Sequence, residues 1–383
     1  MPRTRRSRSR RRGTTSPNSA QHTSRRSHWS RPSPDSTRST CSRAMAERVV
    51  IQGIGGIGGV IAGALLNAGL RPVLVTNNPE ITAAIRANGL RVTSRDRVTH
   101  VRPDVFTTLA DAAGPFDAAY LMMKALGVVD AATETARYLA PDGYVVTFQN
   151  GIVEDAVGAA IGIERVVSAS VGWNGIMHRA GEYERTTPGH TFAGELDGHV
   201  TPRVERLAAA LRHVGPVTLS TNMRGVLWSK LAINCTVNSV GALTGETLGE
   251  LLADPRVRRI FLRTYSEVVD TAEAHGIALE RIAANPKLLY LRNDAGPLVR
   301  YAKDLIARML GRKYKNARSS TLQSLERGRK TEVDFLNGYV CAAAQKVGVP
   351  TPVNTALTHM IKEIEDGARA IARTNVSDLV RQL

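Results

Sequence analysis

Apolar and polar positions alternate between two spacings along the first half of the chain. An apolar run at 49–51 breaks into glycines and is followed by an Ala/Leu-rich helical pattern that reaches about Gly69. Strand and helix patterns then take turns, with strands predicted at 72–76, 118–123, 144–148 and 166–172 and helices at 126–139 and 152–160. This alternation predicts a doubly wound, mostly parallel β-sheet of the Rossmann type.

Shorter extended segments accompany this alternation. Two of them, at 90–94 and 99–105, lie between the second and third strands. After Trp173 the pattern changes to Gly- and Thr-spaced segments, which we expect to add antiparallel strands. The elements predicted to close this domain are strands at 182–187 and 191–196, a helix at 202–213 and a strand at 217–220.

The strand patterns stop after Thr221. Apolar residues then recur at the 3.6-residue period of an amphipathic helix, most clearly at 256–273, 333–347 and 357–371. Between them, a polar and basic stretch at 285–315 predicts a loop with one helix near 298–310. We therefore predict an α/β protein, with an N-terminal Rossmann-type doubly wound parallel sheet at 45–221 and an all-helical C-terminal domain at 222–383.

The glycine-rich turn after the first strand has the spacing Gly53-x-Gly55-x-x-Gly58. Gly53 would allow the tight turn, Gly55 would let the backbone approach a pyrophosphate, and Gly58 would let the helix pack on the strand. The chain has 33 glycines, so the spacing alone is weak evidence and a plain glycine-rich turn is the alternative. The strand before it and the helix after it favour a dinucleotide cofactor at the helix N-terminus.

Most of the excess positive charge lies in the first 44 residues. The formal net charge is +17, and this segment holds twelve arginines and one acid, Asp35, which leaves only +6 for the remainder. The segment is rich in Arg, Ser, Thr and Pro and nearly lacks large aliphatic residues, so we predict a disordered extension. A native start at Met45 is the simplest explanation. An organelle transit peptide is a weaker one, because prolines would spoil its amphipathic helix.

Cysteine usage and hydropathy suggest a cytoplasmic protein. Cys41, Cys235 and Cys341 are far apart and lack metal-ligand spacing, which predicts neither a disulfide framework nor a metal site. No uncharged apolar run is long enough to cross a bilayer. We expect a monomer or homodimer that binds a small molecule and has neither a nucleic acid nor a membrane as a partner.

The candidate chemistry is concentrated at residues 227–238. If this stretch is helical, Lys230, Asn234 and Asn238 share one face, because residues four apart drift by only about 40° per step. No charged residue occurs between Leu231 and Gly245. Two carboxamides on such an apolar helix are costly unless a polar group meets them. A surface lysine with two satisfied core amides is the alternative, but the alignment of all three favours a site.

A second polar cluster lies at 319–323 and 327–334. Gly328 is suited to end one helix, and Thr331 with Asp334 has the spacing of a capping box that starts the next. That would place Glu332 in the first turn of a helix. Stabilisation of a helix N-terminus is then the default explanation for this acid.

Three stretches together resemble the ketopantoate reductases (2-dehydropantoate 2-reductases). They are Gly53-x-Gly55-x-x-Gly58, Trp228-x-Lys230-Leu-Ala-x-Asn234-x-x-x-Asn238, and Ser319-Ser320-x-x-Gln323 with Thr331-Glu332-Val333-Asp334-Phe335-Leu336-Asn337-Gly338. The last two are far more specific than the first, and the likeness runs from about Glu47 to the end, apart from extra residues within 285–315. It implies a Rossmann domain, a helical domain and a substrate site in the cleft between them.

The resemblance also implies the reaction and the roles of single residues. It implies reduction of 2-dehydropantoate to pantoate by hydride transfer from NADPH, a step of pantothenate biosynthesis, with Lys230 as the catalytic lysine. A lowered pKa would make Lys230 a better proton donor. The family's substrate-binding positions correspond to Asn234, Asn238, Ser320 and Glu332. Positions beside the nicotinamide and at the same cleft correspond to Asn150 and Lys124.

Two departures from the family bear on the cofactor and on local support. Asn77, followed by Asn78, stands where the family often has an arginine that binds the 2′-phosphate of NADP. We therefore expect NADPH to be preferred weakly and NADH to work as well, unless Arg95 or Arg97 reaches the phosphate. The family's Gln-Asp pair after the double serine is here Gln323-Ser324. This departure affects the local support of the site more than the identity of the substrate.

Three other classes remain open at this stage. A related 2-oxo acid or hydroxy acid dehydrogenase would share the whole scaffold. A non-catalytic dinucleotide sensor would keep the glycines but would have no need for Lys230, Asn234 and Asn238 on one face. A nucleic-acid-binding protein rests only on the arginine-rich extension.

Overall fold

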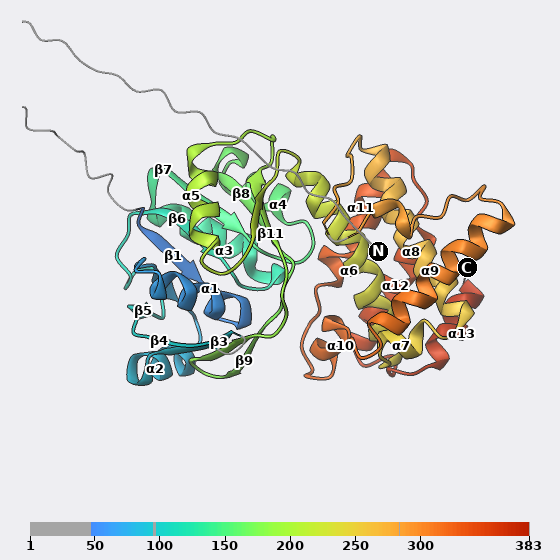
Figure 1. The fold of residues 1–383 in the computed structure, drawn as a ribbon, viewed down its shortest axis with the longest axis horizontal. Helices are drawn as coiled ribbons and strands as arrows, with labels where there is room; N and C mark the ends of the chain where they lie inside the picture. Colours follow the sequence, from blue (N-terminus) through green and yellow to red (C-terminus); the bar gives the residue numbers. More distant parts are fainter. Residues whose placement is uncertain (1–46, 95–96, 283, 383) are drawn as a thin grey trace, which may run out of the picture. The chain divides into compact units, whose positions relative to one another are not determined.

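The computed structural model describes residues 47–94, 97–282 and 284–382 (Figure 1). The predicted disordered extension, Met45 and Arg95 lie outside these residues. The described chain begins with a β-sheet and its covering helices and continues as a set of helices. No helix in the described part is both long and apolar enough to cross a membrane. The predicted α/β fold class is thus confirmed.

An eight-stranded sheet forms the core of the N-terminal half. Its strands are parallel except at one junction, where β11 runs antiparallel to β8. In spatial order they are β12 (Val217–Leu219), β11 (Thr191–Glu195), β8 (Val166–Val171), β7 (Leu139–Thr147), β6 (Phe116–Leu121), β1 (Val49–Gln52), β2 (Val73–Val75) and β5 (Val105–Phe106).

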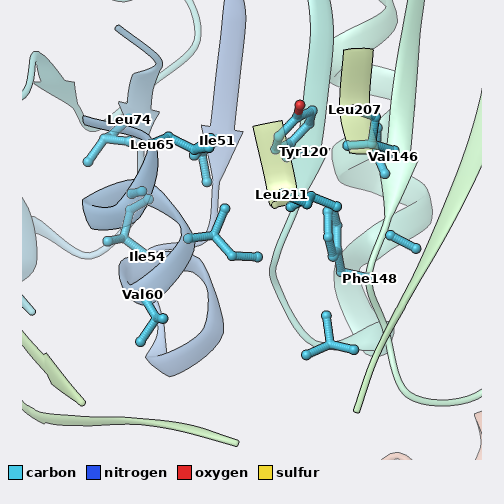
Figure 2. Packing of buried hydrophobic residues seen from close by; sticks show 14 of the residues in the cluster. Ile51, Ile54, Val60, Leu65, Leu74, Tyr120, Val146, Phe148, Leu207 and Leu211 are labelled. Carbon is cyan, nitrogen blue, oxygen red and sulfur yellow. The ribbon is translucent and has the colours of Figure 1, made fainter. Parts of the chain in front are cut away.

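Apolar side chains of β1 point alternately to the two faces of this sheet. Ile51 joins a buried cluster with α1 (Gly56–Asn67) and α5 (Pro202–Leu211), part of which Figure 2 shows. Val50 joins a separate cluster with α3 (Val128–Thr135) and α4 (Glu154–Ile161) on the other face. Because both faces are covered, β6 and β8 are buried at nearly every position, which is why the sequence shows them as mostly apolar runs.

A second, four-stranded sheet corrects the prediction for the shorter segments. Its order is β4 (Arg97–Val101), β3 (Leu90–Ser94), β10 (Glu182–Arg185) and β9 (Gly175–Arg179). Residues 90–94 and 99–101 therefore leave the doubly wound sheet. The strand predicted at 182–187 is β10, which pairs antiparallel with β9, as expected, but parallel with β3. The antiparallel addition predicted at 191–196 is confirmed as β11. Strand β9 was not predicted, because exposed residues hide its period.

The C-terminal half is helical in its described residues. Its central helix, α6 (Met223–Thr244), is N-capped by Asn222, whose side chain accepts from Gly225 N, and ends at Gly245 in the left-handed conformation. The other helices are α7 (Leu248–Leu251), α8 (Pro255–Ala274), α9 (Pro297–Lys313), α10 (Ser320–Leu325), α11 (Asn337–Val347), α12 (Pro352–Glu365) and α13 (Thr374–Gln382). Short 3₁₀ turns occur at Pro286–Leu288 and Val333–Phe335.

Two predicted helix boundaries in this half are wrong. The helix predicted at 333–347 is a 3₁₀ turn followed by α11, because Leu336 leaves helical geometry with φ −105° and ψ −101°. The helix predicted at 357–371 is α12, which begins at Pro352 and ends before Gly367. The predicted bounds followed the apolar period alone. Pro352 in the first turn and Gly367 after the last turn indicate the true ends of this helix.

Candidate active site

The glycine turn leaves open space at the N-terminus of α1. Gly53 has φ +89°, and a Cβ there would lie 2.7 Å from Met123 N. A Cβ on Gly58 would lie 2.2 Å from the Gly53 carbonyl oxygen, so the helix packs directly on the turn. Gly55, the N-cap residue, has no atom within 4 Å of its Cβ position, and no side chain caps the helix. Uncapped N–H groups beside open space suit a pyrophosphate.

The two asparagines after β2 have different environments. Asn78 N-caps α2 (Pro79–Asn88), and its Oδ1 accepts hydrogen bonds from Glu80 N at 2.9 Å and Ile81 N at 3.2 Å. Its carboxamide is therefore occupied within the fold. Asn77 has an exposed side chain at the carboxyl end of the strand, the edge at which ligands of doubly wound sheets bind.

Three arginines of this region have different positions. Arg71, just before β2, donates to the carbonyl oxygens of Leu66 and Leu70 at the C-terminal end of α1, which is the end away from the glycine turn. Arg97 lines a small cavity with Val60, Ala64 and Asn67 of α1. Arg95, the other substitute that the sequence suggested, lies outside the described residues.

Helix α6 carries the predicted polar face. Lys230, Asn234 and Asn238 are each partly buried, whereas Leu231 and Cys235 beside them are fully buried. The Nδ2 atom of Asn234 is buried without a hydrogen-bond partner among the described residues. An unsatisfied amide donor costs about 1–3 kcal/mol, so folding stability does not explain why Asn234 occupies this face.

Lys230 is in an environment that disfavours its charge. Burial lowers the pKa of Lys230 to about 8, while the negative charges of Glu332 and Glu154 act in the opposite direction. Glu154 is buried and accepts hydrogen bonds from the hydroxyls of Thr147 and Ser168, each at 2.7 Å. A lysine with a pKa near neutrality can act as a proton donor at working pH.

Glu332 is not part of a capping box. Thr331 Oγ1 accepts from Val333 N at 3.2 Å, but Thr331 N donates to Glu365 and the Asp334 carboxylate pairs with Lys362. The predicted box is therefore wrong, because partners from α12 outcompete the local pairing.

Glu332 instead reaches across to the N-terminal half. Its Oε1 accepts a hydrogen bond from Ala125 N at 3.1 Å, just after Lys124. Burial raises the pKa of Glu332, whereas that hydrogen bond and the positive charges of Lys124 and Lys230 act to lower it. A carboxylate in this setting lies between two cations rather than at a solvated helix end.

The double serine docks α10 on α6. Ser319 N-caps α10 by accepting from Leu322 N at 3.1 Å, and its hydroxyl donates to the Asn238 carbonyl oxygen at 2.5 Å. A Cβ on Gly241 would lie 2.9 Å from Ser319 Cβ, so the two helices are in close contact there. Ser320, the next residue, has an exposed side chain. The hydrogen bond from Ser319 to the Asn238 carbonyl oxygen thus places the start of α10 against α6.

Lys124 and Asn150 follow the ends of β6 and β7. Gln149 Nε2 donates to the carbonyl oxygens of Leu121 at 2.8 Å and Met123 at 2.9 Å, which ties these two ends together. Lys124 Nζ donates to Ser324 Oγ at 2.9 Å, and Ser324 in turn belongs to α10. Gly151, at φ +92°, leaves no room for a side chain, since its Cβ would lie 2.3 Å from the Phe335 carbonyl oxygen.

Several groups at this site were missed by sequence reasoning or given a lesser role. The N–H of Ala125 has no side-chain signal at all. Glu154 looks like an ordinary first-turn acid, and only the packing of α4 buries it. Ser324 could have been found, because it is four residues after Ser320 and so shares a face of the same short helix.

Most of the chain is similar to proteins of one known family. Residues 49–198 match the family described as "Ketopantoate reductase PanE/ApbA", and residues 222–365 match "Ketopantoate reductase PanE/ApbA C terminal". Together the two matches span most of the chain. This chain belongs to the ketopantoate reductase family. It is accordingly an oxidoreductase, and the family resemblance inferred from the sequence is confirmed.

Individual relatives agree over nearly their whole lengths. The chain is 26% identical over 324 residues to a 2-dehydropantoate 2-reductase of Archaeoglobus fulgidus, covering 84% of this chain and 99% of that protein. The crystal structure of a PanE/ApbA family ketopantoate reductase from Ralstonia eutropha JMP134 is similar with a TM-score of 0.71 and 26% identity, covering 84% and 99% of the two chains.

A ternary structure of D-mandelate dehydrogenase with NADH and anilino(oxo)acetate also has a TM-score of 0.71, over 84% of this chain and 99% of that chain. Its sequence identity is 18%, so it supports the fold alone. The fold is thus shared by proteins that act on different 2-oxo and 2-hydroxy acids.

Proposed function

We propose that this protein reduces the 2-oxo group of 2-dehydropantoate to give pantoate, with NADPH as the hydride donor and Lys230 as the general acid. The observation that carries the proposal is the polar face of α6. A lysine whose pKa burial lowers to about 8 lies on it beside an asparagine with an unsatisfied amide donor. The family membership supports the same reaction.

The cofactor would be held by the glycine turn. The N–H groups at the start of α1 would bind the pyrophosphate next to Gly55, and Asn150 would lie beside the nicotinamide. When bound, a reduced nicotinamide supplies the hydride for the 2-oxo carbon. The residues of this chain provide orientation and charge stabilisation.

Lys230 would complete the reduction at the substrate oxygen. As the carbonyl carbon accepts a hydride, negative charge develops on its oxygen, and a nearby ammonium stabilises that charge. The same ammonium then transfers a proton from Nζ to the oxygen, which yields the hydroxyl. Burial lowers the pKa of Lys230, and this makes the proton easier to transfer.

The polar groups around Lys230 would select the substrate. Asn234, Asn238 and Ser320 would donate hydrogen bonds to its carboxylate and hydroxyl, and Lys124 would add a positive charge from the N-terminal half. Glu332 would accept a hydrogen bond from the substrate hydroxyl. Its contact with Ala125 N holds this carboxylate against the end of β6.

The cofactor preference would be weak. Asn77 offers hydrogen bonds but no positive charge, and the contacts of Arg71 at the other end of α1 support this view. A charge-assisted hydrogen bond to the 2′-phosphate is worth about 1.5–3 kcal/mol. We accordingly expect NADPH to be used best and NADH to support measurable turnover.

A turnover assay tests the proposal. Reduction of 2-dehydropantoate would be followed by loss of NADPH absorbance, alongside 2-oxoisovalerate and other branched oxo acids that lack the hydroxyl. The expected result is the highest kcat/KM with 2-dehydropantoate, because Glu332 and Ser320 then have a hydroxyl to bind. Equal or better use of an oxo acid without the hydroxyl would reassign the protein to a related dehydrogenase.

A further inference from the structure

A cavity of about 750 Å³ lies in the helical half, away from the residues of the candidate active site. It is bounded by α8, the segment before α9, the first turn of α9, the start of α12 and Val380 of α13. Its size is within the range of small-molecule sites in proteins, about 300–1,000 Å³. None of the residues assigned to substrate or cofactor lines it.

Six arginines line this cavity, against one carboxylate, Asp304. Three of them have their charge matched by an acid: Arg256 pairs with Asp254 at 2.8 Å, Arg258 with Asp304 at 2.6 Å and Arg292 with Asp294 at 2.9 Å. The other three are Arg259, Arg263 and Arg300. In the described part of the chain none of these three makes an ion pair, and Arg259 has no hydrogen-bond partner either.

The three guanidinium groups without an ion pair lie close to one another. Arg259 and Arg263 are four residues apart in α8 and so share one face. Arg263 donates to the side-chain oxygen of Asn293, and Arg300 Nη2 donates to the carbonyl oxygen of the same residue at 2.9 Å. Asn293 therefore holds two of these arginines next to each other at the cavity wall.

A buried arginine connects the two helices that carry the charged wall of the cavity. Arg258 is 8% exposed, and its Nη1 donates to the carbonyl oxygens of Leu252 at 3.0 Å and Ala253 at 2.9 Å while its Nε binds Asp304 of α9. This buried arginine fixes α9 against α8. The neighbouring arginines are thus mounted on helices whose separation is fixed.

The remaining wall is apolar. Ile260, Leu262, Leu291, Val353 and Val380 line it, together with the ring of Tyr301, which is 68% exposed. An exposed aromatic ring next to guanidinium groups offers a stacking surface for a planar group. The cavity therefore combines positive charge with an apolar surface.

We propose that this cavity binds an organic phosphate, a phosphate or diphosphate group carried on a planar or apolar body, as in a nucleotide. Planar guanidinium forks match the oxygens of phosphate in paired hydrogen bonds. Arg263 also interacts with the charges of Glu267 and Asp270, whereas Arg259 and Arg300 have no ion pair among the described residues. The excess positive charge of these three arginines is neutralised better by a multiply charged phosphate than by a single carboxylate. Ile260 and Tyr301 would contact the body of the ligand. The proposal is independent of the reductase activity.

A binding measurement with the cleft blocked tests this site. NADPH cannot serve as the blocking agent, because it is itself an organic phosphate and would compete for the cavity. The glycine turn would instead be filled by Gly55→Leu, whose side chain enters the open space at the start of α1, and this full-length variant would be titrated calorimetrically with ADP, adenosine and inorganic phosphate. We expect ADP to bind, inorganic phosphate to bind more weakly and adenosine not to bind. Arg259→Ala and Arg263→Ala should each weaken ADP binding by about tenfold or more.

Matched controls separate the cavity from general charge effects. Arg281→Ala removes an exposed arginine of the same half that does not line the cavity, and it should leave ADP affinity unchanged. Arg259→Lys should recover only part of the affinity, because an ammonium lacks the planar fork. Thermal unfolding without ADP checks that every variant is folded.

Three results would overturn the proposal. They are no ADP binding to the Gly55→Leu chain, ADP binding that Arg259→Ala leaves unchanged in that chain, or ADP binding that Arg281→Ala weakens as much as Arg259→Ala does. The chain should not bind vesicles that contain phosphatidylglycerol. If it binds them, if Arg259→Ala abolishes that binding and if ADP does not inhibit it, this face would instead bind an anionic membrane.

Discussion

The two halves of the candidate active site are built in different ways. The glycine turn uses backbone groups and open space supplied by six consecutive positions, from Gly53 to Gly58. The substrate half uses side chains from α6 and α10, together with Glu332, which precedes a 3₁₀ turn, and Lys124, which follows β6. The first half is specified by local geometry, and the second exists only when distant segments pack together.

This difference has a consequence for mutation. A backbone site has no side chain to remove, so its affinity changes mainly when a side chain is added or when Asn77 beside it is replaced. A site made of side chains loses function when a single group is removed. Variants of the substrate half should therefore produce the larger effects on catalysis, and the following experiments test that ranking.

Removal of the Lys230 ammonium should have the largest effect. Lys230→Ala is expected to lower kcat by about two to four decades, because proton transfer and oxyanion stabilisation act in the transition state. The dissociation constant for NADPH, measured by fluorescence, should change little. Lys346→Ala, a change at an exposed lysine, serves as the control. A Lys230→Ala variant that keeps most of its turnover would exclude the acid role.

Glu332→Gln should be the next most damaging change. Gln keeps an oxygen that can accept from Ala125 N, so the melting temperature should hardly move. The loss of a charged acceptor should lower kcat/KM for 2-dehydropantoate by about tenfold to a hundredfold. Normal kinetics together with a large fall in melting temperature would show that Glu332 is a structural residue.

The pH profile should follow the ammonium of Lys230. Burial lowers its pKa to about 8, and the proton donor is the charged form, present below that pH. The value of kcat/KM should be level below about pH 8 and fall about tenfold per unit above it. Because the charge of Glu332 raises the pKa of Lys230, Glu332→Gln should start this fall at a lower pH. A profile level to pH 10 would contradict this assignment.

Asn77→Arg should increase the preference for NADPH over NADH without changing substrate binding. A guanidinium at this position can pair with the 2′-phosphate, so the NADPH to NADH ratio of kcat/KM should rise by about tenfold. The KM for 2-dehydropantoate should stay constant. If the parent enzyme already prefers NADPH by more than about a thousandfold, another basic residue makes this contact.

Ser324→Ala should have the smallest effect. It removes the hydroxyl that holds Lys124 Nζ at 2.9 Å, a neutral acceptor worth about 1 kcal/mol, so KM for the substrate should rise about fivefold. The KM for NADPH should be unchanged. Thr358→Ala removes a comparable helix hydroxyl, one that donates to Asn354 O, and controls for loss of helix stability. Equal effects of the two changes would remove Ser324 from substrate positioning.

The capping box shows where local patterns fail. Thr331 and Asp334 have the right spacing, yet their partners are Glu365 and Lys362, more than 25 residues further along the chain. Similarly, the segments at 90–94 and 182–185 were recognisable as strands, but their parallel pairing joins residues about 90 positions apart. Spacing rules describe what a segment can do alone, whereas hydrogen-bond partners from distant segments decide what it does.

The sequence by itself determined the elements whose physics is local. Strand β1, the turn at Gly53, the start of α1 and the shared face of Lys230, Asn234 and Asn238 follow from residue type and spacing over fewer than twelve positions. Only the tertiary structure decided that Glu332 meets Ala125, that Ser319 binds the Asn238 carbonyl oxygen, and how far burial lowers the pKa of Lys230, to about 8. Desolvation and cross-chain hydrogen bonds depend on which segments pack together, and that information is not contained in any one stretch of the chain.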